Sequence, residues 1–298
     1  MQSPPPEPAR TGPPRRRKRW PRLSLRSAMV LILIIGLPVG WKARRASIQR
    51  RAVAAIAAMG GYVTYEHELD QRGFPGISRP PPGPAWLRRL IGDEFFREVA
   101  WINLDNRQPD NRLDDESIAS LLQCDRLQGL TIHGPHHPDG ESPTRLITAA
   151  GLAQLDGLSR LRVLHLFNIG TDAAMMALLP RWQTLEDVTI RDRTRTIPGS
   201  SLANLARLPY LQVAVVTSVE SCRPADLTPL ANLPHLGQLI IEHSPQDDRE
   251  AFTLGGRGLT DASIPLLVQH THIYHLVLAG TGITDAGVAG LAAFPALS

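Results

Sequence analysis

The chain has 298 residues and a net charge of +4; 43% of its residues are hydrophobic, but only 5% are aromatic. This length would allow about two ordinary domains, and any core must be built mainly from aliphatic side chains. Two cysteines, Cys124 and Cys222, exclude a disulfide-rich scaffold. Residues 1–51 hold 13 Lys and Arg and one acid, which leaves a net charge of −8 on the remainder. The basic excess therefore belongs to the N-terminus, which argues against nucleic-acid binding by the folded domain.

Residues 1–26 are rich in proline and arginine, and we expect them to be disordered because they offer almost nothing to bury. An uncharged run follows at residues 27–41, and we predict that residues 27–47 form a single-pass membrane anchor with its basic flank. Fifteen uncharged residues reach the lower limit of about 17 only if Arg26 and Lys42 snorkel. A cleaved signal peptide is an alternative, while a buried core helix fits poorly between two arginine clusters. Seven Lys and Arg from Arg15 to Arg26, against five from Lys42 to Arg51, favour a cytoplasmic N-terminus and an external folded domain.

Residues 48–100 precede the repeated part of the chain. Apolar spacing predicts a helix over Ile48–Met59, which Gly60 would end, and Tyr62–Tyr65 is typical of a strand. Glycine and proline predict a loop over residues 72–84, and apolar spacing predicts a second helix over Trp86–Val99. Because a repeat array needs an atypical end unit to cover its first open core edge, we assign this segment a capping role.

From residue 101 to residue 298, one pattern of apolar residues recurs with the spacing L-x-x-L-x-L, and its clearest copy lies in Ile273–Val288. Successive copies are 28, 34, 24, 26, 25 and 37 residues apart. Four of these steps lie within the period of about 20–29 residues of one class of solenoid, and the two longer steps indicate insertions. The second apolar position of each copy falls at Ile102, Leu130, Leu164, Val188, Ala214, Leu239 and Leu276.

A second landmark recurs in register with the first and predicts the start of a helix. A Thr or Asp suited to accept a free backbone N–H precedes apolar residues at helical spacing. Units that contain Pro198 and Pro229 are expected to carry short or irregular helices, because proline lacks the backbone donor. The five copies of the landmark are Leu113–Ile118, Ile147–Leu152, Gly170–Met175, Leu259–Ile264 and Ile283–Val288.

These two landmarks resemble the leucine-rich repeat family, in its helix-bearing, ribonuclease-inhibitor-like subtype. The copy at Ile273–Val288 is similar to those of bacterial membrane-anchored proteins whose repeats read L-x-x-L-x-L-x-x-T-x-I-T-D-A-G-L. The resemblance implies an α/β fold: a right-handed solenoid with a curved parallel sheet on the concave side and helices on the convex side, preceded by one N-terminal hydrophobic helix. It also implies that such an anchor holds the repeats at a membrane.

Strand side chains alternate, so the residue between two core positions should point outward from the concave wall. These residues form a mixed polar and apolar row that could bind a partner or simply face solvent. The row is Asn103, Thr131, His165, Thr189, Val215, Ile240 and Val277.

Two histidine-containing segments are candidate metal sites, since imidazole and carboxylate are good ligands for zinc-like ions. Residues 133–141 include His133, His136, His137, Asp139 and Glu141, and a second group is His270, His272 and His275. Neither has a fixed ligand spacing, and the chain has no nucleophile elbow, phosphate loop or Rossmann fingerprint. The sequence therefore predicts a protein that is not an enzyme, with no cofactor and no metal.

The leading hypothesis is a membrane-tethered module that binds a protein partner on the concave face, held at the membrane through residues 27–41. Nucleic acid and small-molecule substrates are not expected. Fold alone does not establish function, so alternatives stay open: a structural envelope or scaffold protein without a discrete ligand, a secreted repeat protein with a cleaved signal peptide, or a metal-dependent activity at residues 133–141.

Overall fold

The computed structural model describes residues 25–105, 114–134, 147–192, 197–219, 223–243, 260–268, 273–279 and 282–293. The disorder predicted for residues 1–26 falls mostly on residues 1–24, which lie outside the described part of the chain. Two compact units are found, Met1–Ala43 and Arg44–Ser298. Each is described by itself.

Helix α1 (Leu25–Ala58) contains the uncharged run of residues 27–41, together with Pro38. Among the described residues, no helix is both long enough and apolar enough to cross a membrane. The membrane anchor therefore has no support from the structure and stays a prediction from the sequence.

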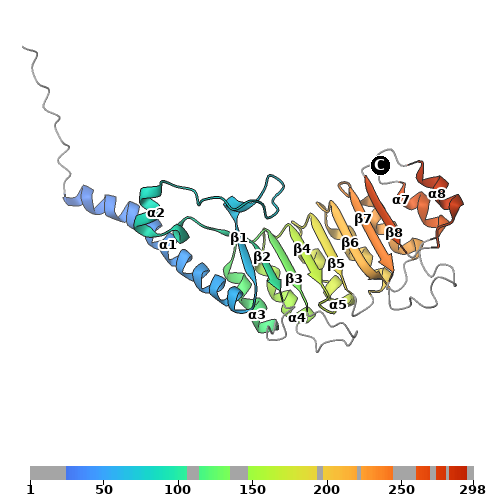
Figure 1. Cartoon of the computed structure of the whole chain (residues 1–298), viewed down its shortest axis with the longest axis horizontal. Helices are drawn as coiled ribbons and strands as arrows, with labels where there is room; N and C mark the ends of the chain where they lie inside the picture. Colours follow the sequence, from blue (N-terminus) through green and yellow to red (C-terminus); the bar gives the residue numbers. More distant parts are fainter. Residues whose placement is uncertain are drawn as a thin grey trace, which may run out of the picture. The chain divides into compact units, whose positions relative to one another are not determined.

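The second unit is organised around an eight-stranded sheet whose strands follow one another in chain order (Figure 1). The first strand runs antiparallel to the second, and every later pair is parallel. This order is that of a solenoid, in which each unit contacts its sequence neighbours. The strands are β1 (Tyr62–Tyr65), β2 (Val99–Asp105), β3 (Gly129–His133), β4 (Val163–Phe167), β5 (Asp187–Arg191), β6 (Val213–Val219), β7 (Gln238–His243) and β8 (His275–Ala279).

The apolar pattern sets the register of the sheet. The residues at the second apolar position pair across neighbouring strands from Ile102 to Leu276, as the spacing predicted. From Ile102 to Leu239 these side chains have 0% exposure, and they belong to one continuous core. Each buried leucine of this kind stabilises the fold by roughly 1.5–3 kcal/mol relative to an exposed one, which is how a chain with few aromatics forms a core.

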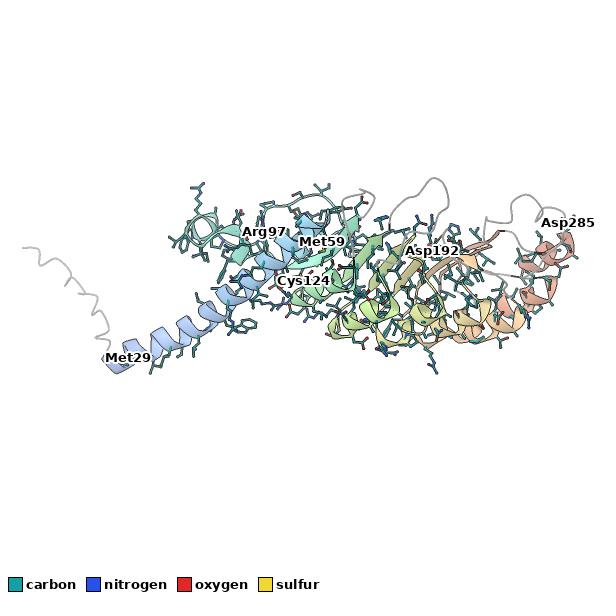
Figure 2. All side chains as sticks on the ribbon, turned by 90° about the horizontal axis from the view of Figure 1, so that it is seen from below. Met29, Met59, Arg97, Cys124, Asp192 and Asp285 are labelled. Atoms are coloured by element: carbon teal, nitrogen blue, oxygen red, sulfur yellow. The ribbon has the colours of Figure 1, made fainter. Side chains whose placement is uncertain are left out.

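Short helices and 3₁₀ turns lie along one face of the sheet (Figures 1 and 2). The units that contain Pro198 and Pro229 form the 3₁₀ segments η6 (Gly199–Arg207) and η7 (Thr228–Asn232), so the expected irregularity is confirmed. These elements are too short to establish the ribonuclease-inhibitor-like subtype, which stays a prediction. The α-helices of this face are α3 (Asp115–Ala119), α4 (Ala149–Ala153), α5 (Ala173–Met176), α6 (Pro224–Leu227), α7 (Ile264–Leu267) and α8 (Asp285–Leu291).

The predicted helix caps are confirmed in four units. The side chains of Asp114, Thr148, Asp172 and Thr284 accept hydrogen bonds from backbone N–H groups in the first turns of α3, α4, α5 and α8. Thr260 is the N-cap of the short segment η9 (Asp261–Ser263), although no N–H bonds to its side chain there. A cap of this kind contributes about 1 kcal/mol because it satisfies a donor that the helix itself cannot.

A carboxylate at the first helical position of one unit also reaches the cap of the next unit. Asp115 accepts hydrogen bonds from Thr148 N (2.8 Å) and Thr148 Oγ1 (2.7 Å). In the same way, Asp261 accepts from Thr284 N (2.8 Å) and Thr284 Oγ1 (2.6 Å). Polar contacts between neighbouring units therefore supplement the shared leucine core.

A glycine lies beside each of these carboxylates, at the third helical position of the following unit. A Cβ on Gly151 would collide with the Asp115 carboxylate, and one on Gly287 would collide with the Asp261 carboxylate. The junction between α4 and α5 is different. The first position of α4 is Ala149 and not a carboxylate, and the third position of α5 is Met175, which is 2% exposed. We call the paired carboxylate, threonine and glycine the inter-unit cap.

The segment before the repeats covers the first edge of the sheet. Strand β1 has the bounds that the sequence predicted and pairs antiparallel with β2. Behind it, Ala52 and Ile56 of α1 are 1% and 0% exposed in the core cluster. The close approach of Gly61, whose Cβ would lie 2.8 Å from Ile56 Cγ2, makes room for this contact.

The predicted helix over Trp86–Val99 is only partly confirmed, because the helix covers its first six residues. Helix α2 (Ala85–Ile91) ends at Gly92, which has φ +91°, a conformation that glycine adopts at little cost. A 3₁₀ turn η2 (Asp93–Phe95) follows, and Val99 already belongs to β2. Trp86 is 67% exposed, so the apolar pattern of this segment does not mark a buried helix face.

Candidate functional site

The predicted concave row lies in register across the sheet. Residue pairing links Asn103 to Thr131, His165 and onward to Val277 without a break. The row alternates with the core positions and so lies on the face of the sheet opposite the core, here called the open face. Register shows that the row exists, but it does not test whether the row binds a partner.

Most of the row is covered by its surroundings. Thr131, Thr189, Val215 and Ile240 are 5%, 9%, 4% and 7% exposed. From the sequence the row was expected to point outward and to be accessible. Alternation shows which face of the sheet a side chain occupies, but it does not show which neighbours cover that side chain. The row is therefore better described as the floor of the open face.

Trp101 lies on β2, two residues before the row residue Asn103 and on the same face of the sheet. Its ring lies across Gly129 on β3, where any Cβ would collide with it, and it is only 4% exposed. The ring centroids of Trp101 and His165 are 6.0 Å apart, in an edge-on arrangement. A large ring on one strand is thus accommodated by a missing side chain on the next.

His165 is the row residue with the most chemically distinctive surroundings. Its Nε2 lies 3.3 Å from Asp187 Oδ1, within ion-pair distance for a protonated imidazole but without hydrogen-bond geometry. Thr189 Oγ1 donates to the same Asp187 oxygen at 3.3 Å. The ring of Phe167 lies 6.1 Å away, edge-on to the imidazole. The group is a polar contact within an aromatic surface.

A loop between β1 and α2 projects over the starts of the strands. Asp70 Oδ1 accepts hydrogen bonds from the backbone N–H of Arg72 (2.8 Å) and Phe74 (2.9 Å), and the Asp70 N–H donates to Phe74 O (2.8 Å). Gly73 has φ +83° at the turn, where a Cβ would be strained. The Phe74 ring packs on Trp101 at a centroid distance of 5.5 Å. We call residues 70–75 the Asp70 loop; its backbone is fixed by its own hydrogen bonds and by this aromatic contact.

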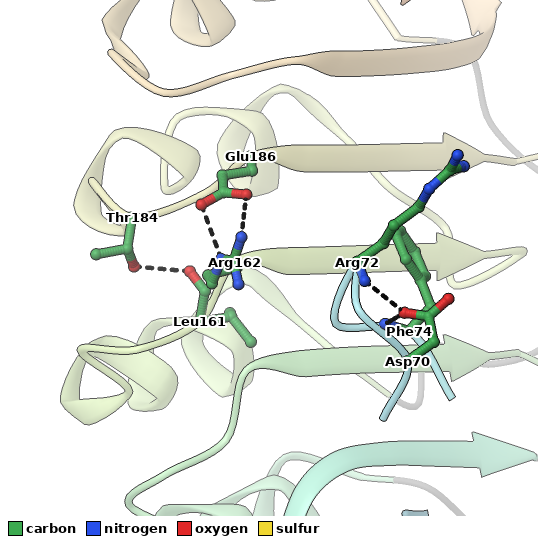
Figure 3. A network of polar contacts seen from close by, with 7 residues as sticks. All are labelled: Asp70, Arg72, Phe74, Leu161, Arg162, Thr184 and Glu186. Atoms are coloured by element: carbon green, nitrogen blue, oxygen red, sulfur yellow. Dashed lines mark hydrogen bonds and ion pairs between the residues drawn. The ribbon is translucent and has the colours of Figure 1, made fainter. Parts of the chain in front are cut away.

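A groove of about 750 Å³ lies between the Asp70 loop and the amino-terminal ends of the strands. Figure 3 shows the loop crossing above the strands, with the Arg162–Glu186 pair at their starts. The sequence did not indicate this groove. Its residues precede the repeated core positions, and their types do not repeat from unit to unit. Its lining is Gln71, Arg72, Gly73, Phe74, Gln128, Arg162, Val163, Glu186, Asp187, Gln212, Val213, Gln238 and Tyr274.

Arg162 and Glu186 form a two-point ion pair in the floor of the groove. Arg162 Nε donates to Glu186 Oε1 at 2.7 Å, and Nη2 donates to Oε2 at 2.6 Å. The hydrogen bonds to Glu186 raise the pKa of the Arg162 guanidinium further above its ordinary value. Planar, two-point geometry fixes both side chains in orientation as well as in charge.

The metal hypotheses fall mostly outside the described residues, which include His133 and His275 but none of the other proposed ligands. Within the described ranges, no three His, Cys, Asp or Glu side chains gather in a group that could hold a metal ion. His133 instead stacks on Phe167 at 4.6 Å with nearly parallel rings. The proposed ligands beyond the described part are His136, His137, Asp139, Glu141, His270 and His272.

Cys124 is a free cysteine that packs as a small apolar residue. It is 2% exposed beneath the sheet, and burial raises the pKa of its thiol to about 12. A thiol held in this state is a poor nucleophile, since the thiolate is the reactive form. Cys222 lies outside the described residues.

The register, the single continuous core and the repeated capped turns define a solenoid of strand–helix units with a parallel sheet. The L-x-x-L-x-L pattern of apolar residues on every parallel strand is the arrangement of a leucine-rich-repeat solenoid. No protein-family model matches the sequence, and no curated protein matches it.

Solved structures with a similar arrangement include two internalins of Listeria monocytogenes. One (inlF) is 14% identical, with 60% of this chain and 49% of that chain covered and a TM-score of 0.39. Internalin C2 is 20% identical, with 67% and 78% covered and a TM-score of 0.35. A protein from Bacteroides fragilis is 15% identical, with 63% and 67% covered and a TM-score of 0.29. The chain thus spans about half the length of the first structure, and likeness at this level carries no argument about function.

Proposed function

We propose that this chain is a non-catalytic protein-interaction module that binds its partner on the open face of the sheet, in the groove beside the Asp70 loop. The observation that carries the proposal is the groove itself, a lined hollow of about 750 Å³. It is bounded by a loop whose backbone is held by four internal hydrogen bonds. A fixed wall of this kind lowers the ordering cost of binding.

The lining is suited to recognition and not to a reaction. It supplies amide, guanidinium, carboxylate and phenol groups, and Tyr274 at one end is 52% exposed. Tyrosine and arginine are enriched among the residues that contribute most to protein–protein binding. In this proposal the predicted row from Asn103 to Val277 forms the floor beside the groove, and its half-buried members Asn103, His165 and Val277 are the ones a partner can reach.

Position-dependent photo-crosslinking tests the site. The full chain carries a photoreactive phenylalanine analogue either at Tyr274 in the groove or at Arg207, an exposed residue of η6 on the helix side. We expect a discrete adduct from position 274 and none of the same mass from position 207. The adduct should disappear when Gln212→Trp fills the groove, because position 212 is exposed and only its backbone is engaged in the sheet. Adducts that are equal from both positions, or that survive Gln212→Trp, would contradict the proposal.

We also propose that residues 27–41 attach the module to a membrane, with the N-terminus in the cytoplasm and the repeats outside. The support is the uncharged run and its unequal basic flanks, seven Lys and Arg from Arg15 to Arg26 and five from Lys42 to Arg51. Carbonate extraction and protease protection would compare the full chain with a version that lacks residues 1–51. Retention of the full chain alone in the membrane fraction, with the repeats open to external protease, is expected. Release of both versions would overturn membrane attachment without bearing on the groove.

A further inference from the structure

The charged side chains that line the groove differ in whether they already have a hydrogen-bond or ion-pair partner. Both carboxylates already have a partner: Glu186 is held by Arg162 at two points, and Asp187 accepts from Thr189 Oγ1 and lies beside His165 Nε2. The Arg72 guanidinium, by contrast, has no hydrogen bond or ion pair with any described residue. A ligand that enters this groove therefore meets one guanidinium without a carboxylate partner, whereas Glu186 is already paired with Arg162.

Arg72 is held ready for an anion by the Asp70 loop. Its backbone N–H is fixed on Asp70 Oδ1, and the neighbouring Gly73 comes close to Arg162, since a Cβ there would lie 3.6 Å from Arg162 Nη1. Figure 3 shows the Arg72 side chain directed away from the Arg162–Glu186 pair and over the strands. A guanidinium matches a carboxylate with two parallel hydrogen bonds, and pairs of this kind are stronger than neutral ones.

The length of the groove indicates a chain molecule and not a small acid. Its lining extends from Gln128, just before β3, to Tyr274, just before β8. Five steps between neighbouring strands of about 4.8 Å each give a span of about 24 Å. An extended peptide covers about 3.3–3.6 Å per residue, so roughly seven residues match this length.

The remaining polar groups suit a peptide backbone. The side-chain amides of Gln128, Gln212 and Gln238 line the groove and have no hydrogen-bond partner among the described residues. Each amide offers both a donor and an acceptor. An extended peptide has unpaired N–H and C=O groups along its whole length, and these must be satisfied when it leaves water.

We propose that the groove binds an extended segment of a partner protein, about seven residues long, through an Asp or Glu side chain that pairs with Arg72. The proposal deepens the proposed function, on which it rests, by naming the chemistry of the bound segment. Arg72 is the specificity-determining residue, the glutamine amides hold the peptide backbone, and the Arg162–Glu186 pair keeps the floor from competing for the ligand's charge.

Selection of displayed random octapeptides on the immobilised full chain tests this assignment. The same library is selected on the wild type, on Arg72→Gln, on Arg72→Glu and on the groove-filling Gln212→Trp. The matched control is Arg79→Glu, because Arg79 is equally exposed, has no partner among the described residues and lies outside the groove. A selected peptide is then made with both ends blocked and a fluorophore attached, and its Kd is measured by anisotropy.

We expect the wild type and Arg79→Glu to enrich Asp or Glu at one peptide position. Arg72→Gln should lose this enrichment, and Arg72→Glu should reverse it towards Lys and Arg. Replacing the peptide's carboxylate by the amide should weaken binding to the wild type about tenfold or more, and by much less to Arg72→Gln. Binding that needs a free peptide C-terminus and is lost on amidation would assign the carboxylate to a chain end and overturn the side-chain version.

The outcomes separate this proposal from the proposed function. Peptides that bind in the groove, as shown by loss of binding to Gln212→Trp, but without any preference for acidic residues would overturn the role of Arg72 and leave the groove as a binding site. Peptides that bind Gln212→Trp as well as the wild type would overturn the groove. Enrichment of no peptide above the uncoated support would overturn both.

Discussion

Two junctions between neighbouring units differ in how the units are joined, although both share the leucine core. Between α3 and α4, Asp115 binds Thr148 and Gly151 leaves space for the carboxylate. Between α4 and α5, Ala149 replaces the carboxylate and Met175 occupies the position of the glycine. The comparison teaches that the core specifies how units stack, whereas the inter-unit cap specifies which unit can follow which.

Removing what both junctions share should have the largest effect. Leu164→Ala deletes a side chain with 0% exposure from the core row, and a substitution of this kind costs about 2–5 kcal/mol through lost burial and the cavity that remains. Urea denaturation followed by circular dichroism measures the change. The control Gln212→Ala, at an exposed position that precedes the row on β6, should cost less than about 0.5 kcal/mol. Equal losses from the two variants would contradict the assignment of the core face.

Breaking the inter-unit cap at the first junction should have the next largest effect. Asp115→Ala leaves the Thr148 N–H and hydroxyl without their acceptor, and hydrogen bonds to a charged group contribute about 1.5–3 kcal/mol. The free energy of unfolding is measured as before. Ala149→Gly, at the same helical position of the next unit, is the control for helix propensity alone, with an expected loss of up to about 1 kcal/mol.

Converting the first junction towards the second sharpens the comparison. Gly151→Ala should destabilise the wild type because the new Cβ collides with the Asp115 carboxylate. In the Asp115→Ala background the carboxylate is gone and only a tight contact of 3.1 Å with the Cβ of residue 115 remains. The same change should then cost much less than in the wild type, since alanine also favours helix over glycine by up to about 1 kcal/mol. A double-mutant cycle measures this difference. Additive effects would show that the carboxylate and the glycine are independent.

Acid should weaken the inter-unit cap formed by Asp261 and Thr284, with the smallest effect of the series. The hydroxyl and backbone hydrogen bonds from Thr284 hold the pKa of Asp261 below its ordinary value. A lowered folded-state pKa gives stability that is complete above the ordinary aspartate pKa of about 3.9 and is lost as the pH falls through the folded value. The difference in Tm between the wild type and Asp261→Ala should therefore be constant above about pH 5 and shrink below pH 4. A difference in Tm that is the same at pH 3 and pH 7 would contradict this assignment.

Most of the architecture could be predicted from the sequence because it depends on spacing. The period of the apolar residues fixed the register from Ile102 to Leu276, and the Thr and Asp landmarks located the caps. The helix predicted over Trp86–Val99 ends early because Gly92 interrupts it, and its apolar residues Trp86, Leu90 and Ile91 are exposed. A periodic pattern reports burial only when a neighbouring element is present to cover it.

The candidate site was less accessible to sequence reasoning. The concave row was located correctly on one face of the sheet, but its low exposure was not predicted. Contacts on that face, such as Trp101 over Gly129, join residues 28 positions apart. The groove depends on the Asp70 loop returning to strands that lie 60 to 200 residues further along the chain. No local sequence pattern predicts this long-range contact. The loop's own turn was more predictable, because an Asp that accepts from backbone N–H groups further along, as Asp70 does from Arg72 and Phe74, is a known turn pattern.

The inter-unit cap also bears on how such an array can change its length. Recombination that deletes or duplicates a unit brings together helix starts that were not neighbours before. A unit with methionine at the third helical position, such as that of Met175, could not follow the unit of Asp115 without a collision, whereas a unit with glycine could follow either. Rearranged genes would therefore survive more often when the exchanged unit starts with Thr-x-x-Gly, which makes these few residues a compatibility rule for the lengthening of the repeat domain.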